Sequence, residues 1–164
     1  MVDYVVDTNV WVEIDKSLAD VDTLTELDCI KICRDWLGSF MAGEDRLIID
    51  LGCEILKEYR RYVKQSDQLA YEWLNALERA PRNKLVEVQI EFDENRDAII
   101  PFDLGDEADR KFVAVALAHE PTPPIVDATD TDWSNEQEKL DEVGIEILEL
   151  CPDYIEEKLA GKQP

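Results

Sequence analysis

The stretch "YVVDTNVWVEI", residues 4–14, places an acid, a hydroxyl and an amide directly behind a run of β-forming residues. Tyr4 to Val6 is a short, continuous apolar run, a pattern typical of a strand that is buried on both faces in a parallel sheet. An acid that closes such a strand has few structural uses. The stretch therefore predicts a sheet that presents Asp7, Thr8 and Asn9 where ligands gather, outside the carboxyl ends of its strands.

The rest of the chain alternates between helical and strand-like patterns. Apolar residues recur at helical spacing in residues 21–41, 52–65, 66–77, 106–120 and 134–144, with Ser134 as the expected N-cap of the last helix. The strand-like runs are "RLIID", "KLVEVQI", "AIIPF", "IVD" and "IEILEL". This alternation predicts an α/β fold, a three-layer αβα sandwich around a central, mainly parallel sheet of about four to five strands.

The length of 164 residues suits a single compact domain, which we expect to span residues 1–150. Residues 151–164 are expected to form a C-terminal tail with at most a short, frayed helix. The apolar runs are short, and no basic segment precedes an apolar core at the N-terminus. We therefore expect no membrane span, no signal peptide and a cytoplasmic location.

The chain has four cysteines, Cys29, Cys33, Cys53 and Cys151, at positions with an apolar or helical pattern. We interpret them as free buried thiols in a reducing compartment. Cys29 and Cys33 lie four residues apart, which leaves a metal-binding or redox pair as an alternative. The single histidine, His119, argues against a histidine-based zinc site and against a Ser-His-Asp triad.

The formal net charge of -22 is the most unusual global feature. A surface this acidic repels a polyanion at long range, so a nucleic-acid substrate would have to overcome that repulsion. A basic partner protein, a salty cytoplasm or a function unrelated to nucleic acids would each account for the charge. Divalent ions could also neutralise a catalytic groove locally.

Acidic residues stand at or near several of the expected strand ends. Because ligands bind outside the carboxyl ends of parallel strands, we expect acids from distant segments to meet in one pocket there. Close carboxylates repel each other unless a cation binds them, and Mg²⁺ and Mn²⁺ prefer such oxygen ligands. Two such ions about 3.5–4 Å apart can drive phosphodiester cleavage without a histidine. The acids concerned are Asp7, Glu58, Asp109, Asp130 and Asp132.

Several acids in these segments also have structural explanations when they are taken singly. Asp106 and Asp109 stand at the start of a predicted helix, where acids are typical caps. Glu54 competes with Glu58 for one position because residues four apart share a helix face, and Asp106 competes with Asp109 in the same way. Asp127 lies within a strand, so its side chain faces either the site or the opposite layer. It is the joint pattern that indicates a site.

In these motifs the chain resembles a PIN domain, the metal-dependent nuclease fold of ribonucleases and toxin nucleases. The resemblance rests on "VVDTNVWV", "IIDLGCEILKEYRRY", "DEADRKFVAVALA" and "PPIVDATDTDW", which occur in the family's order. It implies a PIN-like nuclease domain in residues 1–150, with Mg²⁺ or Mn²⁺ in a pocket of catalytic acids. The implied metal ligands are Asp7, Glu58, Asp109 and Asp130, with Asp132 as an auxiliary ligand and with Thr8, Asn9 and Thr129 in support.

The reaction implied by the resemblance is endonucleolytic cleavage of RNA by a metal-activated water. The family includes toxins that an antitoxin neutralises, so the expected partners are RNA, a basic antitoxin or other basic protein, and a second copy of the chain in a homodimer. Many toxin members are shorter than this chain. Two other functions stay open: a non-catalytic PIN-like module that docks a basic partner, and a magnesium-dependent phosphohydrolase of small phosphates.

Basic and aromatic residues near the motifs are candidates for substrate contacts. The basic residues best placed to meet phosphates are Arg60, Arg61, Lys64, Arg110 and Lys111, although "RRYVK" is also typical of a solvated helix face. Among the tryptophans, Trp36 and Trp73 are expected in the core. Trp11 and Trp133 lie beside the motifs and are candidates to stack on bases.

Overall fold

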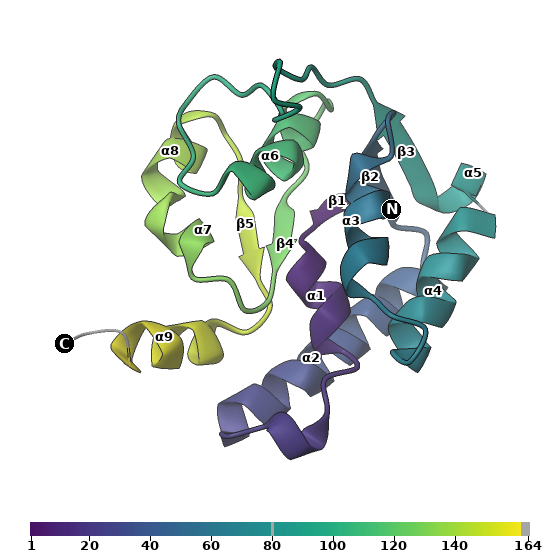
Figure 1. The fold of residues 1–164 in the computed structure, drawn as a ribbon, viewed down its shortest axis with the longest axis vertical. Helices are drawn as coiled ribbons and strands as arrows, with labels where there is room; N and C mark the ends of the chain where they lie inside the picture. The colour runs from purple at the N-terminus through teal and green to yellow at the C-terminus, as the bar shows by residue number, and fades with distance from the viewer. Residues whose placement is uncertain (80, 162–164) are drawn as a thin grey trace.

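The computed structural model describes residues 1–79 and 81–161, and in them five parallel strands form one sheet in the order β3-β2-β1-β4-β5 (Figure 1). The prediction of an α/β fold with a mainly parallel sheet of four to five strands is confirmed. The strands are β1 (Asp3–Val6), β2 (Arg46–Asp50), β3 (Leu85–Val88), β4 (Ile125–Asp127) and β5 (Ile147–Glu149).

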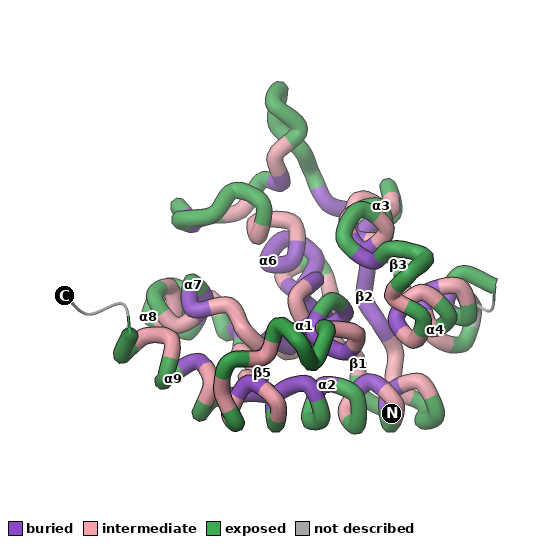
Figure 2. Tube along the Cα trace, turned by 60° about the horizontal axis from the view of Figure 1, so that its bottom comes forward, coloured by how far each residue is buried: buried purple, intermediate pink, exposed green. Residues whose placement is uncertain are grey.

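Helices cover both faces of this sheet, which gives the expected three layers. The helix α2 runs along one face together with α9, and α6 lies on the opposite face beside α3 (Figure 2). The helices are α1 (Thr8–Glu13), α2 (Leu24–Ala42), α3 (Glu54–Tyr62), α4 (Gln68–Arg79), α5 (Pro81–Lys84), α6 (Arg110–Leu117), α7 (Asp132–Asn135), α8 (Gln137–Glu142) and α9 (Pro152–Gly161), with 3-10 turns η1 (Leu18–Asp20) and η2 (Glu107–Asp109).

The first strand lies at the centre of the sheet because its apolar residues pack on both faces. Tyr4 packs edge-on against the rings of Trp36 and Phe40 on α2. Val5 and Val6 are fully buried, and α6 contacts β1, β2 and β4 from the other side. The strand order reverses between β1 and β4, which is the position where parallel α/β sheets bind ligands.

Two predicted elements differ from the structure. The run "AIIPF" forms no strand, and Phe92 and Ala98 make only an isolated antiparallel bridge across a loop that the Asp93 side chain holds together. The helix predicted over residues 134–144 is divided into α7 and α8. Ser134 is therefore not its N-cap; it lies inside α7, and its hydroxyl donates to the Glu149 carboxylate on β5 over 3.0 Å.

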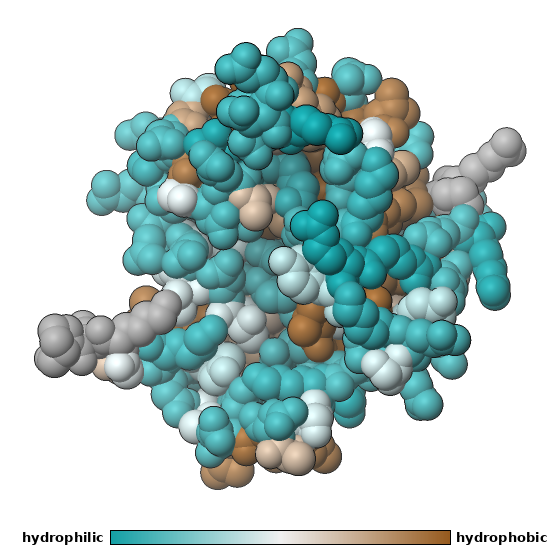
Figure 3. Space-filling model, viewed as in Figure 1, coloured by the Kyte–Doolittle hydropathy of each residue, from teal (hydrophilic) through white to brown (hydrophobic). Residues whose placement is uncertain are grey.

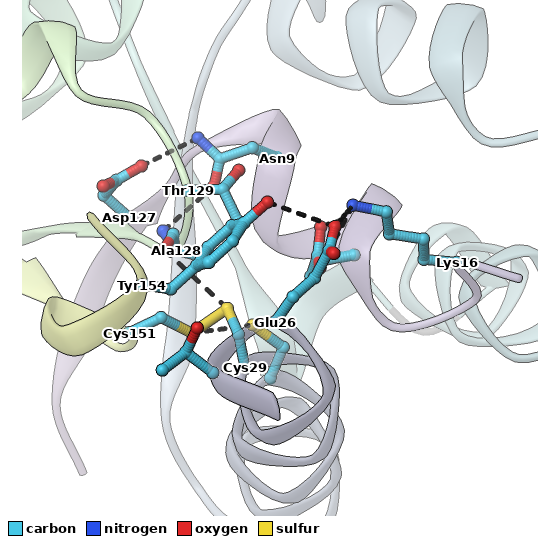
Figure 4. Close-up of a disulfide and its surroundings, with 12 residues drawn as sticks. Asn9, Lys16, Glu26, Cys29, Asp127, Ala128, Thr129, Cys151 and Tyr154 are labelled. Atoms are coloured by element: carbon cyan, nitrogen blue, oxygen red, sulfur yellow. Dashed lines mark hydrogen bonds and ion pairs between the residues drawn. A yellow bond between two sulfur atoms is a disulfide. The ribbon is translucent and has the colours of Figure 1, made fainter. Parts of the chain in front are cut away.

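The C-terminal segment packs closely on the rest of the chain. After β5 it turns into α9 and brings Cys151 to a Cα–Cα distance of 5.3 Å from Cys29 on α2, and the two form a disulfide (Figure 4). The prediction that all four cysteines are free is therefore wrong for these two. Cys33 is free and buried, 3.9 Å from the Cys151 sulfur, and Cys53 is free and half-buried. Residues 162–164 of the predicted tail lie outside the described residues.

The face of the molecule drawn in Figure 3 is mostly hydrophilic, as the composition predicts, and its hydrophobic residues occur in scattered patches. Among the described residues, no helix combines the length and the apolar character needed to cross a membrane.

Candidate metal centre

Three carboxylates from distant parts of the chain meet at the carboxyl edge of the sheet. Asp7 follows β1, Asp130 follows β4, and Asp109 ends η2 immediately before α6. Each offers an oxygen, and these oxygens all lie within 4.8 Å of one another. The structure thus brings together three of the five acids that the sequence singled out, at the reversal of strand order between β1 and β4.

These acids lie in an open cleft of about 390 Å³, called the acidic cleft below. Its lining includes five carboxylates and one ammonium group: Asp7, Glu58, Asp106, Asp109, Asp130 and Lys158. Asp132 is exposed and does not line this cleft. It lines a neighbouring pocket together with Asp106 and Asp109, and its backbone N–H donates to the Asp130 carboxylate over 2.8 Å.

Asp7 is the most constrained of the three carboxylates, with 5% of its surface exposed. As N-cap of α1, its carboxylate accepts a hydrogen bond from the backbone N–H of Asn9 over 3.0 Å. Its second oxygen accepts one from the Trp133 indole N–H over 2.6 Å. Burial raises the pKa of Asp7 to about 6, although both hydrogen bonds act in the opposite direction. The negative charges of Asp130 and Glu58 add to the increase.

Asp109 experiences the same crowding of negative charge. Burial raises its pKa to about 8, and Asp7, Asp106 and Asp130 contribute in that order. Lys111 opposes the shift. A divalent cation bound here would remove this repulsion and would favour the ionised form of these carboxylates.

Glu58 lies at the rim of the cleft and is held by two neighbours. The Thr8 hydroxyl donates to one carboxylate oxygen over 2.6 Å, and the Lys111 ammonium forms an ion pair with the other. Glu54 instead pairs with Lys57 over 2.6 Å and does not line the acidic cleft. Of the two competing glutamates, Glu58 is therefore the one beside the cluster.

Asp106 and Asp109, the two alternatives for the acid of the third motif, have different roles. Asp106 caps η2, where its carboxylate accepts the Ala108 amide over 2.8 Å. Asp109, three residues later, contributes to the three-carboxylate cluster. Asp106 stays in the lining of the cleft, where its charge raises the pKa of Asp109.

Asn9 and Asp127 hydrogen-bond the segments that carry the cluster to each other. The side-chain Nδ2 of Asn9 donates to Asp127 over 2.8 Å, and its Oδ1 accepts the backbone N–H of Ala128 over 3.0 Å. These two bonds connect α1 to the end of β4 (Figure 4). Asp127 is fully buried, and burial raises its pKa to about 8. It also accepts the Asp130 amide over 3.2 Å. Thr129 lines the cleft, and its carbonyl accepts the Lys158 ammonium over 2.6 Å.

The predicted phosphate-binding residues separate into two groups. Arg60 binds Glu78 and Asn75 on α4, and Arg110 pairs with Asp103, so these two face other parts of the surface. Lys64 donates to a carbonyl of its own helix end. The other two, Arg61 and Lys111, line a second and smaller pocket that adjoins the acidic cleft.

The two tryptophans proposed for base stacking are both in the core. Trp11 is fully buried beside Tyr59, with a ring-centroid distance of 5.5 Å, and Trp133 is 1% exposed. Neither can reach a base. Among the described residues, the aromatic side chains classed as exposed are Tyr62 and Phe92. Tyr62 lines the acidic cleft and Phe92 lines the adjoining pocket.

Among the residues that line these two spaces, Tyr62, Phe92 and Lys158 were not anticipated from the sequence. Lys158 lies on α9, within the segment predicted to be a tail outside the domain, and it reaches the cleft because α9 packs on α2. No local spacing indicates that contact. An exposed aromatic at the end of the helix that carries Glu58 is the one signal by which Tyr62 could have been found.

Comparison with known proteins gave no match to any family model, curated protein or solved structure.

Proposed function

We propose that the chain is a divalent-metal-dependent endoribonuclease in which Asp7, Asp109 and Asp130 hold Mg²⁺ or Mn²⁺. The observation that carries the proposal is the meeting of these three carboxylates, from distant segments, within 4.8 Å at the carboxyl edge of a parallel sheet. Ligands on opposite sides of Mg²⁺ are separated by about 4 Å, so small side-chain movements would complete the coordination. The donors are all hard oxygens, which suit these ions.

When bound, such an ion supplies a Lewis acid and a water of lowered pKa for attack on a phosphodiester. The chain's own residues orient the ligands. Trp133 and the Asn9 amide fix the Asp7 carboxylate, while the Asp132 amide fixes Asp130. Lys111, paired with Glu58, holds an ammonium in the pocket that adjoins the cleft, where it can meet a backbone phosphate.

Two features favour a nucleic acid over a small phosphate as substrate. The cleft is open, and the exposed ring of Tyr62 in its lining offers a stacking surface for a base. The resemblance of the four sequence motifs to PIN domains further supports RNA. Because the surface is strongly acidic, we expect binding to depend on the divalent ion that neutralises the cleft.

The first experiment compares the wild type with Asp7→Asn on a mixed pool of single-stranded and structured RNAs, with Mn²⁺, Mg²⁺ or chelator. We expect cleavage that requires the metal and that falls by roughly a hundredfold or more in Asp7→Asn. Asp28→Asn, on an aspartate with a 64% exposed side chain on α2, is the matched control and should keep its activity. Circular dichroism verifies that both variants fold.

Cleavage in chelator, or an undiminished rate in Asp7→Asn, would reject the proposal. Metal binding without cleavage of any RNA would favour the interaction module that docks a basic partner. Hydrolysis of nucleotides or sugar phosphates, with RNA left intact, would favour the small-molecule phosphohydrolase.

A further inference from the structure

A second pocket of about 190 Å³ opens beside the acidic cleft, between α3, the loop of residues 92–98 and η2. Glu58 and Ala108 line both, so the two spaces are adjacent. We call it the basic pocket because its lining gathers four basic side chains: Lys57, Arg61, Arg96 and Lys111. Apart from Lys111, the proposed nuclease activity gives none of these side chains a role.

The basic pocket differs from the acidic cleft in charge. Its four basic side chains are balanced by four carboxylates, so its formal charge is neutral in a chain whose net charge is -22. The acidic cleft has five carboxylates and one ammonium group in its lining. A polyanion that extends from the cleft therefore meets much weaker repulsion over the basic pocket.

Several cationic groups in the basic pocket remain open to a ligand. Within the described part of the chain, the guanidinium group of Arg61 forms no hydrogen bond or ion pair, and the residue is exposed. Lys57 is 61% exposed although it pairs with Glu54. The Arg96 side chain is 85% exposed and reaches Glu54 only at 4.0 Å. These donors can bind a phosphate without breaking a buried contact.

The loop that closes the pocket has a defined conformation. The Asp93 carboxylate accepts the amides of Asn95 and Asp97 over 2.8 and 3.0 Å. Arg96 adopts the left-handed region at a φ of 71°, which turns the chain, and the bridge between Phe92 and Ala98 closes the loop. The loop thus presents an aromatic ring and a cation on the same pocket.

We propose that the basic pocket binds the nucleotide next to the cleavage position in a single-stranded substrate. Its phosphate would contact Arg61, Lys57 and Arg96, and its base would stack on Phe92. Because Tyr62 offers a second exposed ring in the adjoining cleft, a strand that crosses both spaces can stack two bases only if they are unpaired. Cleavage beside this nucleotide rests on the proposed function, whereas binding of the nucleotide does not.

The test measures the affinity of a fluorescent ten-nucleotide oligouridylate by anisotropy, with Ca²⁺ in place of Mg²⁺ and with the probe verified as intact. Removal of two cations in Lys57→Gln/Arg61→Gln is expected to lower the affinity at least about fivefold at low salt. A plot of the logarithm of the association constant against the logarithm of the salt concentration has a negative slope. The magnitude of this slope should decrease by about 0.7 for each lost phosphate contact.

The control, Lys31→Gln/Arg79→Gln, removes the same two charges from residues that line neither space. Lys31 matches Lys57 closely: the two are 60% and 61% exposed, and each pairs with an acid three residues earlier. This control should keep both the affinity and the slope.

Stacking is tested separately at Phe92. Phe92→Leu keeps an apolar side chain but removes the ring, so we expect the oligouridylate to bind at least about fivefold more weakly, whereas Phe92→Tyr should restore the affinity. A base-paired hairpin probe should be insensitive to Phe92→Leu. Uridine monophosphate should bind the wild type much more weakly than the oligouridylate.

The inference would be overturned if Lys31→Gln/Arg79→Gln lost as much affinity as Lys57→Gln/Arg61→Gln. It would also be overturned if Phe92→Leu weakened binding of the hairpin as much as binding of the oligouridylate, or if uridine monophosphate bound as tightly as the oligouridylate. The measurements also separate it from the proposed function. A wild type that shows the expected binding pattern but cleaves no RNA supports the pocket and rejects the nuclease. Metal-dependent cleavage with an unchanged KM in Lys57→Gln/Arg61→Gln supports the nuclease and rejects the pocket.

Discussion

Trp133 serves both the core and the candidate metal centre. Its ring is almost fully buried, and its indole N–H donates to the Asp7 carboxylate over 2.6 Å. A donor aimed at a carboxylate stabilises the ionised form, which is the form that binds a metal. The residue therefore acts on the centre through Asp7 rather than through a contact of its own with substrate.

Trp133→Phe keeps most of the buried ring and removes only this donor. We expect the pKa of Asp7 to rise above its value of about 6 and the affinity for Mn²⁺ near neutral pH to fall roughly tenfold. Calorimetric titration with Mn²⁺ at several pH values measures both effects. Trp73→Phe, the same change at a half-buried tryptophan on α4, is the control, and an unchanged pH profile in Trp133→Phe would contradict the prediction.

At the scale of elements, α9 is fixed to the rest of the chain by both covalent and polar contacts. The Cys29–Cys151 disulfide joins its start to α2, and the Tyr154 hydroxyl donates to Glu26 on α2 over 3.1 Å. Lys158, one turn further along, reaches the Thr129 carbonyl beside the cleft. The position of this lining residue thus depends on how firmly α9 is attached.

Cys151→Ser removes the disulfide, whose partners are 122 residues apart in sequence. We expect the free energy of unfolding to fall by about 2–4 kcal/mol, because closing so long a loop restricts the unfolded chain. Denaturant titration without reductant measures the loss. Cys151 is the residue to replace, since Cys29→Ser would leave Cys33 close enough to form a new disulfide.

Cys53→Ser is the control for this experiment. Cys53 is a free, half-buried cysteine, so this change should alter the free energy of unfolding little. A loss in Cys151→Ser no larger than in the control would show that the disulfide does not stabilise the fold.

The elements differ in how far the sequence determines their place at the site. The ends of β1 and β4 follow from short β-branched runs, so Asp7, which follows β1 directly, and Asp130, three residues after the end of β4, could be predicted. Helical spacing alone could not distinguish Glu54 from Glu58, because the choice depends on the Thr8 hydroxyl and the Lys111 ammonium from other segments. The placement of α9 depends on tertiary contacts of the same kind, with Glu26 and the Thr129 carbonyl.

At the scale of the whole molecule, the buried carboxylates link stability to pH and metal. The pKa values of Asp7, Asp109 and Asp127 are raised to about 6, 8 and 8 in the folded protein, above the usual 3.8. Between about pH 4 and pH 8 these groups therefore bind more protons in the folded state than in the unfolded state. Stability from these groups is therefore complete below about pH 4 and is lost as the pH rises through the folded values.

We expect the metal-free protein to unfold at a lower denaturant concentration at pH 8 than at pH 5, and Mn²⁺ to reduce this difference because it stabilises the ionised cluster. Asp109→Asn removes one titrating group, so its stability should depend less on pH. Asp28→Asn, which changes the net charge equally on the surface, should retain the wild-type dependence. A stability that rises between pH 5 and pH 8 in chelator would contradict the prediction.

The disulfide also divides the chain into a closed ring and two arms. Residues 29–151 form the ring, which contains Glu58, Asp109 and Asp130, whereas Asp7 lies in the N-terminal arm. A metal held by all three aspartates would join arm and ring at a second point. A single cut in an exposed loop of the ring, such as the loop of residues 92–98, would leave the two pieces covalently connected.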